Sequence, residues 1–261
     1  MEKTGQRKPM AVANWKMAMT ISEGLAFSEA FPTTVGDLVD SKTIVICPPF
    51  TALHTLSMAF SGFPVELGAQ DLCAEPGYAH TGEISASLIA DTGCKWVMLG
   101  HWEIRLRTGE TDSKINEKLH AACQAGLKPI LLAGERTSER GRVREAMTTR
   151  LPGLFSGCHP KQVARMTLIY EPEWSIGARK PAPPDHVAEG CSLIRDWLAR
   201  TYGRDVAKRV RIIYGGSVAP GNARELLASP DVDGLGTGRK GRDPEAFAKI
   251  IRLIAQEKKL A

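Results

Sequence analysis

Short apolar runs recur along this chain, separated by longer stretches of mixed polarity. Most of the runs are continuously hydrophobic instead of alternating, which is typical of strands buried on both faces of a sheet. We interpret eight runs as strands: Met10–Asn14, Thr43–Cys47, Val65–Ala69, Trp96–Gly100, Pro129–Ala133, Thr167–Tyr170, Arg211–Tyr214 and Val232–Leu235.

Several stretches between the runs carry apolar residues at every third or fourth position, which is the spacing of one helix face. The clearest predicted helices are Ile21–Phe31, Ser113–Ala125, His186–Tyr202 and Phe247–Ala255. Asp112 can cap the N-terminus of the second of these helices, and Gly126 can end it. Strands that alternate with helices favour a parallel sheet with right-handed crossover connections.

The number of strand–helix units indicates the fold. Eight units in 261 residues predict an α/β protein of the closed (β/α)8 barrel type, for which about 250 residues is typical. A doubly wound sheet is the alternative, but a dinucleotide-binding sheet needs a glycine-rich loop after its first strand. That position reads ANWKM here. No low-complexity linker divides the chain, so we expect a single barrel domain over residues 1–261, with the barrel proper at about 10–256.

Composition narrows the class of protein without assigning a function. The chain is 43% hydrophobic and 24% charged, with a formal net charge of +5, as in an ordinary globular protein. Its 34 Lys and Arg residues are dispersed, which gives no support for nucleic-acid binding and fits attraction of small anions equally well.

Cysteine spacing and hydropathy indicate the cellular compartment of the protein. The six cysteines show neither CxxC nor zinc-ligand spacing, so we expect reduced thiols and no metal site. The N-terminus lacks the apolar core of a secretory signal, and no run reaches the roughly 18 apolar residues of a membrane span. We therefore expect a cytoplasmic protein that does not associate with membranes.

Ionisable residues follow several of the predicted strands. In a (β/α)8 barrel the active site forms at the C-terminal ends of the strands. Glu171 follows the sixth run and precedes Pro172, a suitable place for a general base under a closing lid. Lys16 follows the first run and can hold a phosphate as a point charge. His101 follows the fourth run and can act as an acid or electrophile on a carbonyl. Each also has an ordinary interpretation: a loop cap, a solvated lysine and a structural histidine.

Two glycine-rich turns follow the last two predicted strands, at Tyr214–Ser217 and Gly234–Arg239. Backbone N–H groups in such turns bind anions, and the loops after strands seven and eight form the usual phosphate site of these barrels. Ordinary tight turns are the alternative. Together with the carboxylate, the histidine and the lysine, these turns indicate proton transfer beside the carbonyl of a small phosphorylated sugar.

The motifs ANWKM, GAQD, HTGEIS, VMLGHWE, YEPEWSIG, IIYGGSV and DVDG occur in this order and resemble the triosephosphate isomerase family from about Ala11 to about Ile254. The resemblance implies a (β/α)8 barrel that forms a homodimer, with the loop Gln70–Ser85 entering the partner subunit. It also implies cofactor-free interconversion of a ketose phosphate and an aldose phosphate through an enediol(ate), a step of glycolysis and gluconeogenesis.

The resemblance implies a role for each candidate catalytic residue. Glu171 would move a proton between adjacent carbons, and His101 would be the neutral electrophile that polarises the carbonyl. Asn14 and Lys16 would hold substrate, with Lys16 stabilising negative charge. The position of Glu103 after the fourth run, independent of the resemblance, suggests that it orients Lys16 or acts itself; as an ordinary residue it would pair with Arg105.

The same resemblance implies a phosphate site. Gly177, Ser217 and Gly238 would contact the phosphate through backbone or hydroxyl groups. Arg239 stands where the family usually has a second glycine, and it would either add charge to this site or point into solvent.

Other departures surround the catalytic groups. Trp102 stands next to His101 in place of a small hydroxyl residue. Ile104 replaces an arginine that in the family pairs across the dimer with the carboxylate matching Glu83. Glu173 places a second carboxylate near Glu171 in the sequence.

The tip of the predicted lid also differs from the family. Ala178 and Arg179 replace its usual Thr-Gly, and loss of that glycine is expected to stiffen the lid. Retained chemistry in altered surroundings leaves three hypotheses: a triose phosphate isomerase, a paralogue that isomerises a tetrulose phosphate such as erythrulose phosphate, and a non-catalytic sensor or scaffold that binds a sugar phosphate.

Overall fold

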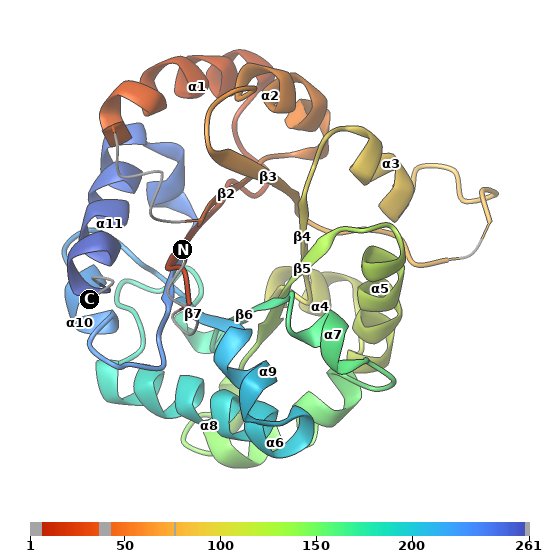
Figure 1. Ribbon diagram of the computed structural model, residues 1–261, viewed down its shortest axis with the longest axis vertical. Coiled ribbons are helices and arrows are strands. Elements are labelled where there is room, and N and C mark those ends of the chain that lie inside the picture. Colours follow the sequence, from red (N-terminus) through yellow and green to blue (C-terminus); the bar gives the residue numbers. More distant parts are fainter. Residues whose placement is uncertain (1–6, 37–42, 76, 259–261) are drawn as a thin grey trace.

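The computed structural model describes residues 7–36, 43–75 and 77–258. Eight parallel strands close into a barrel in sequence order, and helices surround it (Figure 1). The predicted (β/α)8 barrel is therefore confirmed. The strands are β1 (Met10–Asn14), β2 (Thr43–Cys47), β3 (Val65–Ala69), β4 (Trp96–Leu99), β5 (Lys128–Ala133), β6 (Thr167–Tyr170), β7 (Arg211–Gly215) and β8 (Gly234–Thr237).

The last strand lies two residues later than the apolar pattern predicted. Val232 precedes the strand, and the Asp233 carboxylate accepts a hydrogen bond from the backbone N–H of Ile212 at 2.8 Å. The strand itself reads GLGT, and a Cβ at Gly234 would lie 1.8 Å from the carbonyl oxygen of Met10. Close approach to β1 therefore favours glycine here, and a glycine-rich strand shows no hydrophobic run.

Helices or short 3-10 turns follow the strands. The α-helices are α1 (Ile21–Val35), α2 (Leu53–Ala59), α3 (Ala86–Asp91), α4 (Trp102–Thr108), α5 (Asp112–Gln124), α6 (Val143–Leu154), α7 (Pro160–Val163), α8 (Pro184–Tyr202), α9 (Arg204–Arg209), α10 (Ala223–Leu226) and α11 (Pro244–Glu257). The 3-10 turns include η3 (Thr137–Glu139), η4 (Glu173–Ser175) and η5 (Arg239–Arg242). No helix in the described ranges is both long and apolar enough to cross a bilayer.

The predicted cap of α5 was wrong by one residue. The hydroxyl of Thr111, not Asp112, accepts the N–H of Lys114 at 3.2 Å. Asp112 instead accepts a hydrogen bond from Arg105 at 2.6 Å. A tertiary partner thus takes the carboxylate that the local sequence offered as a cap.

The barrel strands bury both faces, as their continuous hydrophobicity predicted. Side chains such as Val12, Met98 and Ile169 form one cluster inside the barrel, while alternate residues such as Ala11 and Val97 join a larger cluster against the helices. The barrel interior is therefore a packed core, which leaves room for a ligand at the barrel ends and not along the barrel axis.

Candidate active site

A cavity of about 920 Å³ lies at the C-terminal end of the barrel. Its floor includes the side chains of Val12, Met98 and Ile169, which reach up from the barrel core. All nine candidate site residues line it: Asn14, Lys16, His101, Glu103, Glu171, Gly177, Ser217, Gly238 and Arg239. Five strand ends thus bring together residues that are far apart in the sequence.

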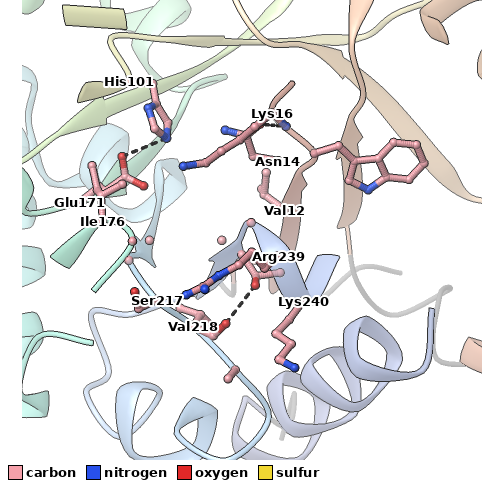
Figure 2. A pocket seen from close by; sticks show the side chains of 18 of the residues that line it. Val12, Asn14, Lys16, His101, Glu171, Ile176, Ser217, Val218, Arg239 and Lys240 are labelled. Atoms are coloured by element: carbon pink, nitrogen blue, oxygen red, sulfur yellow. Dashed lines mark hydrogen bonds and ion pairs between the residues drawn. The ribbon is translucent and has the colours of Figure 1, made fainter. Parts of the chain in front are cut away.

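The Glu171 carboxylate is held inside this cavity with one oxygen available. The residue is only 8% exposed, and its Oε2 lies 3.5 Å from Nε2 of His101 (Figure 2). Oε2 is buried and has no hydrogen-bond partner among the described residues. A Cβ at Gly215 would lie 3.1 Å from Oε1, so the glycine leaves room for the carboxylate. A buried acceptor without a partner is costly, and it is suited to receive a proton from a ligand.

The tautomer of neutral His101 follows from its place at the start of α4. The backbone N–H of Glu103 donates to Nδ1 at 3.1 Å, so Nδ1 is an acceptor. In the neutral ring the hydrogen therefore lies on Nε2, which faces Glu171. Arg105 stabilises this loop because its Nε donates to the carbonyl oxygen of Gly100 at 2.9 Å. The site thus presents an N–H donor beside a carboxylate.

Lys16 adopts a strained backbone conformation. Its φ is +55°, in the left-handed region, which costs a residue other than glycine roughly 1–3 kcal/mol. The Asn14 side chain accepts the Lys16 N–H at 2.9 Å, and the Gln70 side-chain amide donates to its carbonyl oxygen at 2.9 Å. The ammonium group lies 2.5 Å from Oε1 of Glu103. Figure 2 shows Lys16, His101 and Glu171 converging on one part of the cavity.

A lid, which we define as Trp174–Lys180, covers part of the cavity. The Ser217 hydroxyl lies 2.9 Å from the carbonyl oxygen of Ser175 and 2.8 Å from that of Ala178. Beyond the lid, the backbone N–H of Ala182 donates to the hydroxyl of Tyr214 at 2.9 Å. Ser217 of the loop after β7 therefore fastens the lid in this position, and Tyr214 of β7 holds the segment that follows the lid.

Glu135 anchors the start of the lid through a hydrogen bond with Trp174. The residue has no exposed surface, and its carboxylate accepts hydrogen bonds from Nε1 of Trp174 at 2.8 Å and from the hydroxyl of Tyr170 at 2.8 Å. Nε2 of His186 lies 2.7 Å from the same carboxylate. Burial acts to raise the pKa of Glu135, but the hydrogen bonds, led by that of His186, outweigh burial and lower the pKa.

The lowered pKa of Glu135 predicts that the protein loses stability in acid. The unfolded carboxyl has a pKa of about 4.3, so its stabilising contribution is present above that pH and disappears as pH falls through the lower folded value. We expect the free energy of unfolding to fall more between pH 5 and pH 3 in the wild type than in Glu135→Gln. Denaturant titrations across this pH range measure it. The exposed Glu189→Gln serves as the control, and equal slopes for all three proteins contradict the prediction.

Glu173 does not share the cavity with Glu171. Its carboxylate accepts the backbone N–H of Thr137 at 3.0 Å, and its own N–H donates to the carbonyl oxygen of Glu135 at 3.0 Å. The guanidinium of Arg140 lies 4.2 Å from the centre of the Trp174 ring. Glu173 therefore ties the start of the lid to the loop after β5.

Trp102 lies behind the Glu171 backbone and does not line the cavity. The side chain is buried, and its Nε1 donates to the carbonyl oxygen of Glu171 at 2.9 Å. The guanidinium groups of Arg105 and Arg150 each lie 5.2 Å from the indole. A Cβ at Gly134 would lie 2.1 Å from the same carbonyl oxygen. The Trp102 hydrogen bond and the close approach allowed by Gly134 together fix the position of the Glu171 backbone.

We expect Trp102→Phe to act on turnover more than on substrate binding. Phenylalanine keeps an aromatic ring but leaves the Glu171 carbonyl oxygen without this donor, which costs about 1–3 kcal/mol. A base that is less firmly held lowers kcat by about tenfold with little change in KM. Steady-state kinetics measure this split, with Trp197→Phe as the control. A change in KM alone contradicts the positioning role.

The far side of the cavity is polar and positively charged. Ser217 has φ of +49°, and the Asn222 side-chain amide donates to its carbonyl oxygen at 3.1 Å. Arg239 is exposed and extends toward Ser217 (Figure 2). Lys240 also lines the cavity, although its side chain points away from His101. An anionic group is suited to this side, across from the carboxylate.

Three residues here were missed as site residues from the sequence. Gln70 fixes the Lys16 backbone, Glu135 holds the lid, and the Tyr214 hydroxyl accepts from Ala182. Gln70 and Glu135 closely follow β3 and β5. A polar residue just after a buried strand is the sequence signal that marks both.

Known proteins resemble this chain over nearly its whole length. The family model for triosephosphate isomerase matches residues 9–254. A protein of Carboxydothermus hydrogenoformans named triosephosphate isomerase is 41% identical over 248 residues, covering 94% of this chain and 98% of that protein. Proteins of the same name from Herpetosiphon aurantiacus and Symbiobacterium thermophilum are each 40% identical, covering 94% and 96% of this chain and 99% and 98% of their own lengths. The chain therefore belongs to the triosephosphate isomerase family.

Proposed function

We propose that this chain interconverts dihydroxyacetone phosphate and glyceraldehyde 3-phosphate without a cofactor, through an enediol(ate). The observation that carries the proposal is the buried, unpartnered Oε2 of Glu171, 3.5 Å from Nε2 of His101. A base beside an N–H donor is the pair needed to take a proton from a carbon while the neighbouring carbonyl oxygen gains charge.

The proton balance needs only groups of this cavity. Glu171 takes a proton from the carbon next to the carbonyl, and the electron pair moves onto the carbonyl oxygen. The Nε2–H of His101 and the ammonium of Lys16 stabilise that oxygen. Glu171 returns the proton to the neighbouring carbon, and hydroxyl protons rearrange between the two oxygens. No electron leaves the substrate.

Asn14 and Glu103 position Lys16 in this mechanism. Asn14 holds its strained backbone through the N–H, and Glu103 lies 2.5 Å from its ammonium group. Asn14 and Lys16 also contact substrate in the proposal, since both line the cavity.

Phosphate binding completes the proposal. In the proposal, Gly177 of the lid, Ser217, Gly238 and Arg239 contact the phosphate, and all four line the cavity. A lid fastened over the phosphate excludes water, which protects an enediolate from losing its phosphate. Arg239 adds a positive charge that the glycine of the family pattern does not supply.

We further propose a homodimer through the loop Gln70–Ser85. This loop, between β3 and α3, extends away from the barrel (Figure 1). Tyr78 of this loop is fully exposed in the single chain. Met17, which follows Lys16, is also fully exposed. Large apolar groups without cover indicate an interface. Sedimentation of wild type and Tyr78→Glu tests this, with a monomeric wild type as the contradicting outcome.

A reducing, cytoplasmic location fits the six free cysteines.

Coupled assays on three substrates test the activity: dihydroxyacetone phosphate, glyceraldehyde 3-phosphate and erythrulose phosphate. Turnover of both trioses, lost in Glu171→Gln, supports the proposal. Preferential turnover of erythrulose phosphate assigns the chain to the tetrulose phosphate paralogue instead. Binding of all three without turnover identifies a sensor or scaffold.

A further inference from the structure

A second cavity, of about 680 Å³, lies at the other end of the barrel. Its lining residues precede or begin strands: Arg7 and Lys8 precede β1, Lys128 begins β5, and Arg211 begins β7. Others come from α9 and from the segment before β6. We call it the basal cavity. Because the strands are parallel, it opens at the end opposite Glu171.

The basal cavity is strongly basic. Seven of its lining residues are Lys or Arg, and Asp205 is its one acid. This formal excess of six positive charges exceeds the +5 of the whole chain. Basic residues that are dispersed in the sequence therefore meet in this cavity, and the rest of the chain carries almost no net charge. Like charges gathered in a concave site repel one another and attract anions.

The inner wall holds a guanidinium without a carboxylate bonded to it. Nη1 of Arg211 donates to the Thr43 hydroxyl at 2.9 Å, and the group lies 5.2 Å from the centre of the Trp96 ring. Burial lowers the pKa of Arg211. The ammonium of Lys128 lies 4.9 Å from the same ring. An aromatic face stabilises cations, but it does not neutralise them.

The nearby carboxylates are already engaged. Glu66 accepts a hydrogen bond from Trp96 at 2.7 Å, and the ammonium of Lys128 lies 3.4 Å from it. Asp233 pairs with Arg7 at 2.6 Å and with Arg195 at 2.7 Å. The protein itself therefore leaves much of the charge in this cavity without a counter-ion.

Four cations at the rim have no ion pair with the described part of the chain: Lys8, Arg165, Lys208 and Arg209. All four are exposed. Lys208 and Arg209 stand in the last turn of α9, where the helix dipole favours cations. Free cations on several sides of one hollow form a multivalent anion site.

We propose that the basal cavity binds a linear polyphosphate chain, either free tripolyphosphate or the phosphate chain of a nucleoside triphosphate. Tripolyphosphate carries about four or five negative charges at neutral pH, since each phosphoryl group carries one or two. That charge matches Arg211 together with the four free cations of the rim. The planar guanidinium of Arg211 suits bidentate contact with a phosphoryl group.

The size and shape of the basal cavity favour such a small ligand over a nucleic acid. A hollow of about 680 Å³ falls within the range of small-molecule pockets. Its cations line one hollow instead of forming the long stripe that follows a nucleic-acid backbone.

Calorimetric titration of the whole protein with tripolyphosphate, in buffer without divalent cations, tests the proposal. We expect one site per chain, with a Kd at least about tenfold lower than that of inorganic phosphate, because a chain of phosphoryl groups reaches several of the free cations at once. Lys208→Ala/Arg209→Ala should weaken binding by about tenfold or more. Arg144→Ala/Lys249→Ala removes two exposed cations elsewhere on the chain and should leave the Kd unchanged.

Two further arms separate this site from the other cavity and from nucleotide binding. Saturating dihydroxyacetone phosphate should leave tripolyphosphate binding intact, since the two cavities lie at opposite ends of the barrel. Tighter binding of ATP than of tripolyphosphate assigns a nucleotide; equal or weaker binding assigns the phosphate chain alone. Thermal melts without ligand confirm that both double variants are folded.

Three outcomes overturn the proposal: equal weakening in both double variants, displacement of tripolyphosphate by dihydroxyacetone phosphate, or tripolyphosphate binding no tighter than phosphate. Arg211→Lys gives a further check at the inner wall. It keeps the charge but removes the planar fork, so binding should weaken by several-fold while the fold is retained.

Discussion

We expect Glu171→Asp to lower kcat by about a hundred- to a thousandfold, because the shorter side chain moves the carboxylate of the proposed base on the order of 1 Å away from the reacting carbon. The proposed phosphate contacts involve other residues of the cavity, so KM should change little. The free energy of unfolding should change by less than about 1 kcal/mol, because Oε2 of Glu171 has no hydrogen bond to lose.

A matched control for this substitution is two residues away. Glu173→Asp shortens a carboxylate of the same segment, but Glu173 bonds to Thr137 and does not line the cavity. We expect at most a severalfold loss of activity there. Steady-state kinetics and denaturant unfolding of both variants give the answer. Equal losses of stability and activity in Glu171→Asp would show that Glu171 supports the fold instead of acting as the base.

Lys16→Gly is expected to separate activity from stability. Loss of the ammonium removes the charge proposed to stabilise the enediolate oxygen, so kcat/KM should fall by about a hundred- to a thousandfold. Glycine adopts φ of +55° without strain, and the relief of roughly 1–2 kcal/mol offsets its greater loss of backbone entropy. The pair with Glu103 is well exposed, so its loss should cost little stability. The melting temperature should therefore stay within a few degrees of the wild type.

Lys240→Ala is the control for that experiment, because Lys240 lines the same cavity but points away from His101 and Glu171. We expect less than a tenfold change in kcat/KM for this variant. Comparable losses in the two variants would mean that the cavity attracts substrate by its general charge. A large drop in the melting temperature of Lys16→Gly would contradict the assignment of strain to this residue.

The barrel could be predicted from the sequence because both faces of its strands are buried. Seven of the eight predicted strands coincide with the observed strands to within one residue at each end. The eighth does not, because close packing against Met10 selects glycine at Gly234 and leaves little side-chain signal. The cap of α5 was misassigned because Arg105 takes Asp112.

The cavity could be predicted because a parallel barrel brings all strand C-termini to one end. Residues as distant as Asn14 and Arg239 therefore line one space. Strand order and motifs were enough to predict that these residues line the cavity. The positions of the Glu173 and Trp102 side chains could not be predicted in this way. The sequence shows that these residues are near Glu171 and His101 in the chain, but it does not show the direction of their side chains.

By itself, the amino-acid sequence determined the fold, the family and the set of candidate catalytic groups, because hydrophobic periodicity and strand-end chemistry are local properties. Only the tertiary structure decided that Trp102 contacts the Glu171 backbone, that Glu135 anchors the lid, and that dispersed basic residues gather in the basal cavity. These depend on which distant side chains meet, and long-range packing, unlike periodicity, leaves no pattern in the local sequence.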